Sequence, residues 1–256
     1  MLIADKRVER KAARINDPSN AGLDPARGLI IEFVGPPGCG KTTNCAHFST
    51  LLNDKGVKTY VFKDVKEFLY SLGFLRRIRL YVSAPLYNIV RLFSYFYLLA
   101  SNGILSADSG IRYIKLCIFD AAAREFMKTR RVDVLLLDQW IIQSLWSATI
   151  FKARTYVTLQ QRLPEFYFPA SCVLYFDLDP ETASDRIEAR ASDTSRFDRM
   201  DPERRLAEMK HYNDYLKDLY KRSECASKLT FSAKVDPHIN AEAFLKHLQS
   251  TFPKEN

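Results

Sequence analysis

The sequence lacks the cysteine pattern of a zinc-binding or disulfide-stabilised domain. Its five cysteines include no C-x-x-C pair, and their odd number does not suit a complete set of intramolecular bridges. Reduced thiols of this kind are typical of cytosolic proteins, so we expect a cytoplasmic protein.

No segment predicts secretion or a membrane span. The first 20 residues are charged and lack the apolar stretch of a signal peptide. The longest uncharged run lies between Arg91 and Asp108 and is interrupted at Asn102-Gly103, short of the roughly 20 apolar residues that cross a bilayer. We expect residues 1–28 to form a charged N-terminal arm and residues 29–256 to form a single domain.

Nucleic-acid-binding signatures are absent too, although the chain is basic. Lysine and arginine total 38 against 30 acidic residues, a formal net charge of +8. Such an excess favours an anionic partner. Without an RRM, zinc-finger or helix-turn-helix pattern, we expect no nucleic acid.

Apolar runs alternate with helical patterns from Leu29 onward. Such alternation predicts an α/β fold, a three-layer αβα sandwich with a five-stranded parallel sheet covered by helices on both faces. The predicted strands are 29–34, 57–65, 132–138, 171–179 and 228–233. The predicted helices are 44–56, most of 66–105 with breaks near Pro85 and Gly103, 111–128, 180–190, 201–220 and 240–252.

A phosphate-binding loop separates the first strand from its helix. The segment GPPGCGKTT at 35–43 contains the P-loop (Walker A) pattern GxxxxGK[ST] in the required strand–loop–helix context. Its glycines let backbone N–H groups turn towards phosphates, and the helix N-terminus adds positive charge. Lys41 would reach the β- and γ-phosphates and Thr42 would hold Mg²⁺. The predicted nucleotide-binding residues are Gly35, Pro36, Pro37, Gly38, Cys39, Gly40, Lys41, Thr42 and Thr43.

A carboxylate follows the strongest apolar strand. Asp138 ends VDVLLLD, which places it at the sheet edge where ligands bind in open α/β folds. It is therefore a candidate ligand for Mg²⁺ or for its water, with a helix N-cap as the alternative.

Arginines are concentrated in the segment 186–205. Arg186 and Arg190 are four residues apart on one helical face, and Arg196 lies in a polar stretch. Guanidinium groups suit phosphate oxygens. We therefore interpret 186–200 as an arginine-rich lid whose charge serves phosphoryl transfer; the alternative is a solvated helix face.

Together these motifs resemble the thymidylate-kinase-like branch of the P-loop nucleoside and nucleotide kinases. The resemblance rests on GPPGCGKTT at 35–43, LLLDQW at 135–140 and YFDLDPETASDRIEAR…RFDRM at 175–200, and covers Leu29 to the C-terminus. It implies Mg-ATP as donor, with transfer of the γ-phosphoryl group to a small-molecule acceptor. It also implies catalytic roles for Lys41, Arg186, Arg190 and Arg196, a metal-binding role for Thr42 and Asp138, and an adenine site beside 233–235.

The acceptor side departs from the thymidylate kinase pattern. Gln139 stands where an arginine is usual, which marks either altered specificity or lost activity. The second strand is followed by KDVKE at 63–67 instead of an Arg-Glu-Pro type sequence. Asp64 or Glu67 could act as the base for a hydroxyl acceptor. Arg112 and Arg124 are candidate acceptor contacts.

The segment 68–105 is rich in aromatic residues and has three interpretations. Core or homodimer helices, an aromatic acceptor pocket, and a helix at the membrane surface that reads a lipid-linked substrate all fit the pattern. The last would suit a kinase of a sugar or lipid-linked polysaccharide acceptor. A regulatory P-loop NTPase is the other alternative, but the DxxG and NKxD elements of GTPases are missing.

Overall fold

The computed structural model describes residues 28–150, 162, 166, 170–190 and 195–251. The predicted N-terminal arm, apart from Gly28, lies outside the described residues. So do residues 191–194 of the predicted lid.

A five-stranded parallel sheet forms the centre of the molecule and confirms the predicted α/β fold. Its order is β2-β3-β1-β4-β5, so β1 lies between β3 and β4. Leu29 pairs with Val134 and Ile31 with Cys172, which brings the carboxyl ends of these three strands to one edge. The strands are β1 (Leu29–Val34), β2 (Thr59–Val61), β3 (Val134–Leu137), β4 (Ala170–Asp177) and β5 (Cys225–Ser232).

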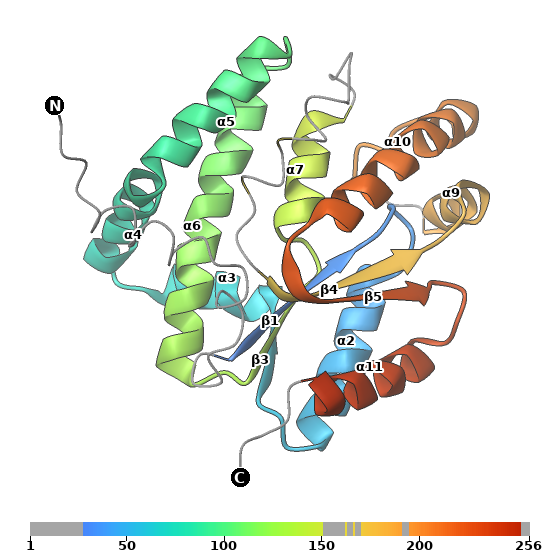
Figure 1. Ribbon diagram of the computed structural model, residues 1–256, viewed down its shortest axis with the longest axis horizontal. Helices are drawn as coiled ribbons and strands as arrows, with labels where there is room; N and C mark the ends of the chain where they lie inside the picture. Colours follow the sequence, from blue (N-terminus) through green and yellow to red (C-terminus); the bar gives the residue numbers. More distant parts are fainter. Residues whose placement is uncertain (1–27, 151–161, 163–165, 167–169, 191–194, 252–256) are drawn as a thin grey trace, which may run out of the picture.

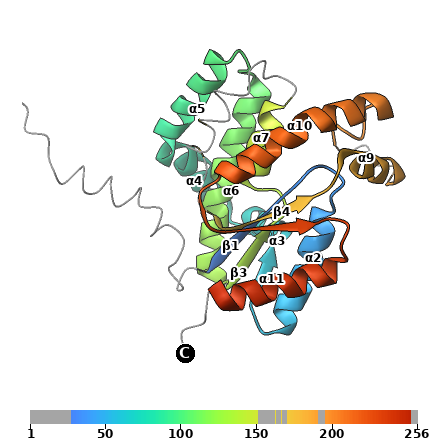
Figure 2. The ribbon, with the colours of Figure 1, turned by 45° about the vertical axis from the view of Figure 1, so that its right-hand side comes forward.

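Helices cover both faces of this sheet (Figures 1 and 2). On one face lie α2 (Lys41–Asp54) and α11 (Pro237–Thr251), and on the other α6 (Ala107–Arg130), α7 (Ile141–Thr149) and α10 (Pro202–Arg222). The remaining helices are α3 (Phe62–Ser71), α4 (Phe74–Tyr87), α5 (Ile89–Ser101) and α9 (Pro180–Ala189). In both views α4 and α5 lie outside α6, away from the sheet.

Alternate residues of β1 serve the two faces. Phe33 points towards α2, where its ring stacks on Phe176 at 5.4 Å and meets Phe48 edge-on at 5.2 Å. Phe48 in turn stacks on Phe244 of α11 at 5.1 Å. Because side chains alternate along a strand, Glu32 points to the opposite face, where it meets α7.

One local prediction was wrong, and one helix was not predicted. The strand predicted at 57–65 is confined to Thr59–Val61, and helix α3 follows at once. The Asp64 carboxylate accepts a hydrogen bond from the Val61 N–H at 2.7 Å, which stabilises the start of that helix, and Val65 and Leu69 are buried one turn apart. Helix α7 was not predicted, although its buried apolar residues, Ile141, Ile142, Leu145, Trp146 and Ala148, recur at helical spacing in the sequence.

The predicted break near Pro85 lies a few residues later. Helix α4 continues through Pro85 to Tyr87, and α5 starts at Ile89. The break at Gly103 is confirmed, since this glycine follows the end of α5 with a φ of 66°. Among the described residues, no helix is long and apolar enough to cross a membrane.

Candidate active site

The phosphate-binding loop occupies the carboxyl edge of β1, between the sheet and α2. Gly38 and Gly40 have φ values of 82° and 79°, in the left-handed region that favours glycine. A Cβ on Gly38 would lie 2.6 Å from the Ala183 carbonyl oxygen of α9, so a side chain would also clash there. The loop thus ends in an open α2 N-terminus, whose backbone N–H groups suit an anion.

Lys41 folds back over this loop. Its Nζ donates to the carbonyl oxygens of Gly35 at 2.8 Å and Pro36 at 3.1 Å. The ammonium group is therefore already placed above the loop, where a bound phosphate would offer stronger, charge-assisted partners.

Thr42 and Asp138 come together although they are 96 residues apart in the chain. The Thr42 hydroxyl donates to Asp138 Oδ2 at 2.8 Å. A hydroxyl and a carboxylate oxygen beside a phosphate loop fit Mg²⁺, which prefers oxygen ligands and takes few of them from the protein. These two residues would hold the ion predicted from the sequence.

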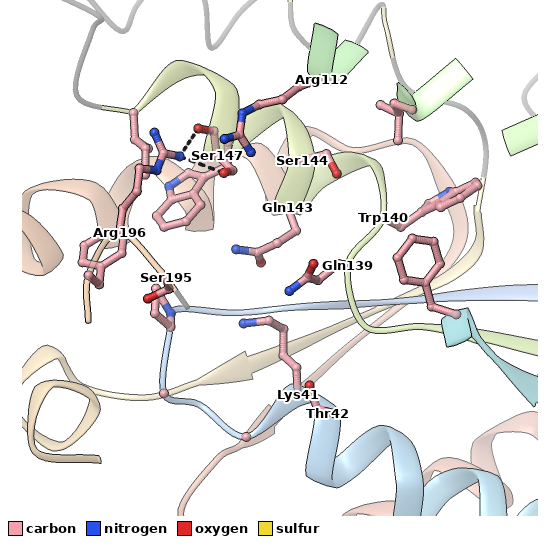
Figure 3. Close-up of a pocket in the computed structure, with 18 of the residues that line it drawn as sticks. Lys41, Thr42, Arg112, Gln139, Trp140, Gln143, Ser144, Ser147, Ser195 and Arg196 are labelled. Atoms are coloured by element: carbon pink, nitrogen blue, oxygen red, sulfur yellow. Dashed lines mark hydrogen bonds between the residues drawn. The ribbon is translucent and has the colours of Figure 1, made fainter. Parts of the chain in front are cut away.

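A cavity of about 690 Å³ opens above the loop and reaches α3, α6, α7 and the segment after α9 (Figure 3). It has a strongly positive lining, and none of the described lining residues is Asp or Glu. Gln139 and Gln143 point into it from the side opposite Lys41. The cationic lining residues are Lys41, Lys66, Arg112, Lys115, Arg186, Arg190 and Arg196.

The predicted lid arginines Arg186 and Arg190 both reach this cavity. Arg186 donates from Nη1 to the Ala233 carbonyl oxygen at 3.1 Å, which ties α9 to the segment that the resemblance places beside adenine. Arg190 pairs with Asp198. Partial burial raises the pKa of Asp198, but the bonds from Arg190 and Ser195 outweigh it and hold this pKa at about 2.

Arg196 closes the cavity from the side of α7. Its guanidinium donates to the Ser147 carbonyl oxygen and to Ser147 Oγ, the latter at 2.8 Å (Figure 3). Burial and the nearby positive charge of Arg112 lower the pKa of Arg196. Arg112 also pairs with Asp108 at 2.9 Å, and the charge of Asp108 opposes the lowering of the Arg196 pKa. An anion in the cavity would relieve the repulsion that remains between the two guanidinium groups.

Helix α7 is anchored to the sheet by Glu32. This side chain is only 2 % exposed, and its Oε1 accepts hydrogen bonds from the N–H groups of Ile142 at 2.7 Å and Gln143 at 3.4 Å. Burial raises the pKa of Glu32 to about 8, although both bonds oppose the rise. Gln143 Oε1 accepts from the Gly35 N–H at 3.4 Å, which links α7 to the phosphate loop.

Several lining residues were not predicted. Arg112 was a candidate acceptor contact, and Lys115, Leu116 and Phe119 share its face of α6 at helical spacing, a signal present in the sequence. Others lie on α3, whose first residues were predicted as a strand, and on α7, which was not predicted although its helical spacing is present in the sequence. They are Phe62 and Lys66 on α3, and Gln143, Ser144, Trp146 and Ser147 on α7.

Three candidates lie outside the lining of this cavity. Asp64 faces the start of α3, as described above, and Glu67 pairs with Lys63 at 3.7 Å on the surface. Arg124 pairs with the buried Asp120 at 2.9 Å farther along α6. The structure therefore brings together the predicted phosphate-loop, metal and lid residues, and Asp64 is not among the residues that line their cavity.

The comparisons with known proteins give a fold-level likeness. No protein-family model and no curated protein sequence matches this chain. Two solved structures of deoxyadenosine kinase from M. mycoides are similar to it, one with the products dCMP and a flexible dCDP bound and one with dCTP bound. The TM-scores are 0.46 and 0.44 and the identities 14% and 16%, over 87% of this chain and 100% of each neighbour. At so low a similarity, any function has to be argued from the geometry of the site itself.

Proposed function

We propose that the chain is an ATP-dependent small-molecule kinase, thymidylate kinase-like in its motifs, that transfers a γ-phosphoryl group to a nucleotide or nucleoside-like acceptor. The observation that carries this proposal is the Thr42–Asp138 hydrogen bond at the mouth of the phosphate loop, beside a cavity lined by cations. Phosphoryl transfer depends on positioning and on stabilisation of charge, and this arrangement supplies both.

The donor half of the cavity would hold ATP. Lys41 would exchange its bonds to Gly35 and Pro36 for the β- and γ-phosphates, and the α2 N-terminus would face the phosphates with its N–H groups. Mg²⁺ held by Thr42 and Asp138 would neutralise phosphate charge when bound.

Arginines would stabilise the charge that develops on the transferred group. Arg190 and Arg196 reach the cavity from α9 and from the segment that follows it. Their present partners, Asp198 and Ser147, keep the guanidinium groups oriented before a ligand arrives. Preorganised charge of this kind lowers the barrier without reorganisation during the reaction.

The acceptor half favours an acceptor that carries its own phosphate. Lys66, Arg112 and Lys115 face it, and no described carboxylate lines it. A phosphate oxygen is already a nucleophile and needs no base, whereas an alcohol benefits from one. If the acceptor is an alcohol, Asp64 is our proposed base, and α3 would have to present it differently.

The test is ADP release from Mg-ATP by the purified chain with nucleoside monophosphates, nucleosides and sugars as acceptors. Stimulation by a monophosphate, abolished in Lys41→Ala, would support the proposal. Stimulation by nucleosides or sugars alone would indicate a hydroxyl acceptor and favour Asp64 as its base. Hydrolysis of ATP that no acceptor stimulates would contradict a small-molecule kinase and favour a regulatory NTPase.

A further inference from the structure

Helices α4 and α5 carry a continuous apolar stripe on their outer face. Seven exposed side chains follow one another at steps of three or four residues, the spacing of a single helix face. Their exposed fractions run from 38% at Ile89 to 80% at Leu75. The stripe consists of Leu75, Ile78, Val82, Leu86, Ile89, Phe93 and Tyr97.

The stripe crosses the junction between the two helices without a break in phase. The Asn88 N–H donates to the Ala84 carbonyl oxygen at 3.3 Å, and the Asn88 carbonyl oxygen accepts from the Leu92 N–H at 2.8 Å. Helical hydrogen bonding therefore continues across the junction, and α4 and α5 form one bent rod. At about 1.5 Å per residue, the stripe is roughly 30 Å long.

This face is distinct from the face that packs into the protein. Leu80, Ala84, Tyr95, Leu98 and Leu99 are each at most 7% exposed. Tyr95 stacks on Tyr113 of α6 at 4.2 Å. One side of α4 and α5 therefore packs into the hydrophobic core, and the residues of the outer stripe do not contribute to that packing.

Exposed apolar side chains are concentrated here. Of the sixteen large exposed apolar residues in the described part of the chain, thirteen fall within 70–105. Soluble proteins seldom expose so large a contiguous apolar surface unless it binds a partner.

Charge decides which partner fits. Residues 68–107 contain four arginines and neither Asp nor Glu. Arg76 and Arg79 are exposed and each follows a stripe residue by one position, which puts them about 100° around the helix from it. Arg76 also forms a surface ion pair with Glu125 of α6 at 3.3 Å, and lipid phosphates would compete for this guanidinium group. At the flank of an apolar face, such side chains can reach outward to anionic groups while the stripe is buried.

We propose that the outer face of α4 and α5 docks on an anionic lipid bilayer, with the stripe among the acyl chains and the flanking arginines at lipid phosphates. Apolar and aromatic residues on one face with basic residues beside it are typical of helices that lie in the membrane interface. Pairing with a second copy would place the same arginine-bearing face against itself; residues 68–107 hold no acidic residue to oppose those charges, and Glu125 of α6 already pairs with Arg76.

Flotation of the full chain with vesicles tests this proposal. We expect binding to phosphatidylcholine vesicles that contain phosphatidylglycerol, weak binding to pure phosphatidylcholine, and loss of binding as salt rises. Arg76→Gln/Arg79→Gln should weaken binding roughly thirtyfold, because each basic side chain near an anionic surface contributes about 1 kcal/mol. Val82→Ser/Phe93→Ser should weaken it at least tenfold, and both positions are exposed, so the fold should survive.

Matched controls separate this surface from bulk charge and bulk hydrophobicity. Lys55→Gln/Lys246→Gln removes the same charge from exposed sites elsewhere, and Ile239→Ser removes an exposed apolar side chain from α11. Both controls should bind vesicles as the unaltered chain does. Absence of vesicle binding would overturn the proposal. So would a dimer that Val82→Ser/Phe93→Ser dissociates while vesicle binding is unchanged. Neither result depends on kinase activity.

Discussion

The two halves of the cavity are built in different ways. The donor half comes mainly from one short segment, 35–43, joined by Asp138 and by the lid arginines Arg186 and Arg190. The acceptor half takes Lys66 from α3, Arg112 and Lys115 from α6, and Ser147 from α7. No two of these three helices are joined by a short connection in the chain.

This difference explains why the two halves carry such different signals. A phosphate is recognised by backbone N–H groups and one helix N-terminus, so its site needs fixed glycines at fixed spacing. A larger acceptor is recognised by side chains alone, and any scaffold that brings them together will serve. The donor half can therefore be recognised from a local sequence motif, whereas the acceptor half is assembled when helices that are distant in the chain pack together.

The largest expected effect is in the donor half. Lys41→Ala should lower kcat roughly a thousandfold, because it removes a charge aimed at the group in transfer. Steady-state kinetics with a saturating acceptor would measure this, and Lys55→Ala at the exposed end of α2 is the control. Turnover by Lys41→Ala at the rate of the unaltered chain would show that the phosphate-binding loop does not take part in phosphoryl transfer.

The metal contact should come next in size. Asp138→Asn should lower kcat roughly a hundredfold and raise the Mg²⁺ concentration needed for half-maximal rate, because one of two protein ligands loses its charge. A titration with Mg²⁺ would show it. Asp133→Asn, at the opposite end of β3, should leave that titration unchanged; its carboxylate bonds the Lys58 N–H at 2.9 Å instead. Equal effects of the two changes would contradict the metal assignment.

The acceptor half should respond in binding instead of rate. Arg112→Ala or Lys115→Ala should raise the acceptor KM roughly tenfold and leave the ATP KM unaltered, since each removes one charge-assisted contact. Lys128→Ala, an exposed position near the end of α6, is the control. A change in the ATP KM instead would place these residues in the donor half and contradict the separation of the cavity into donor and acceptor halves.

The smallest effect on activity is expected at Glu32, which joins the two halves through α7. Its folded-state pKa of about 8 lies above the ordinary value of 4.5, so it stabilises the fold less as pH rises between these values. Glu32→Gln keeps the acceptor oxygen and removes this loss. At pH 8 it should be roughly 2–4 kcal/mol more stable than the unaltered chain, with no gain near pH 4.5. Denaturant unfolding across this range would measure it, with Glu203→Gln as an exposed control. If the unfolding free energies of Glu32→Gln and the unaltered chain changed in parallel with pH, the raised pKa of the buried Glu32 carboxyl would be contradicted.

Much of the fold was predictable because buried strands and amphipathic helices have different periods. β1, β3 and β4 are apolar runs, and α6 shows Ile111, Ile114 and Ile118 at helical spacing. One prediction failed where a local contact outweighs the apparent pattern: KDVKE continued an apparent strand, but Asp64 caps α3. Helix α7 was missed although its apolar residues recur at helical spacing.

By itself the sequence determined the five parallel strands, the phosphate loop and the candidate residues Lys41, Thr42 and Asp138, because local spacing fixes them. Only the tertiary structure decided that Asp138 reaches Thr42, that seven cations line a cavity without a described carboxylate, and that Asp64 lies outside it. It also decided which face of α4 and α5 is outside. These facts depend on contacts between segments far apart in the chain, and such contacts leave no local pattern.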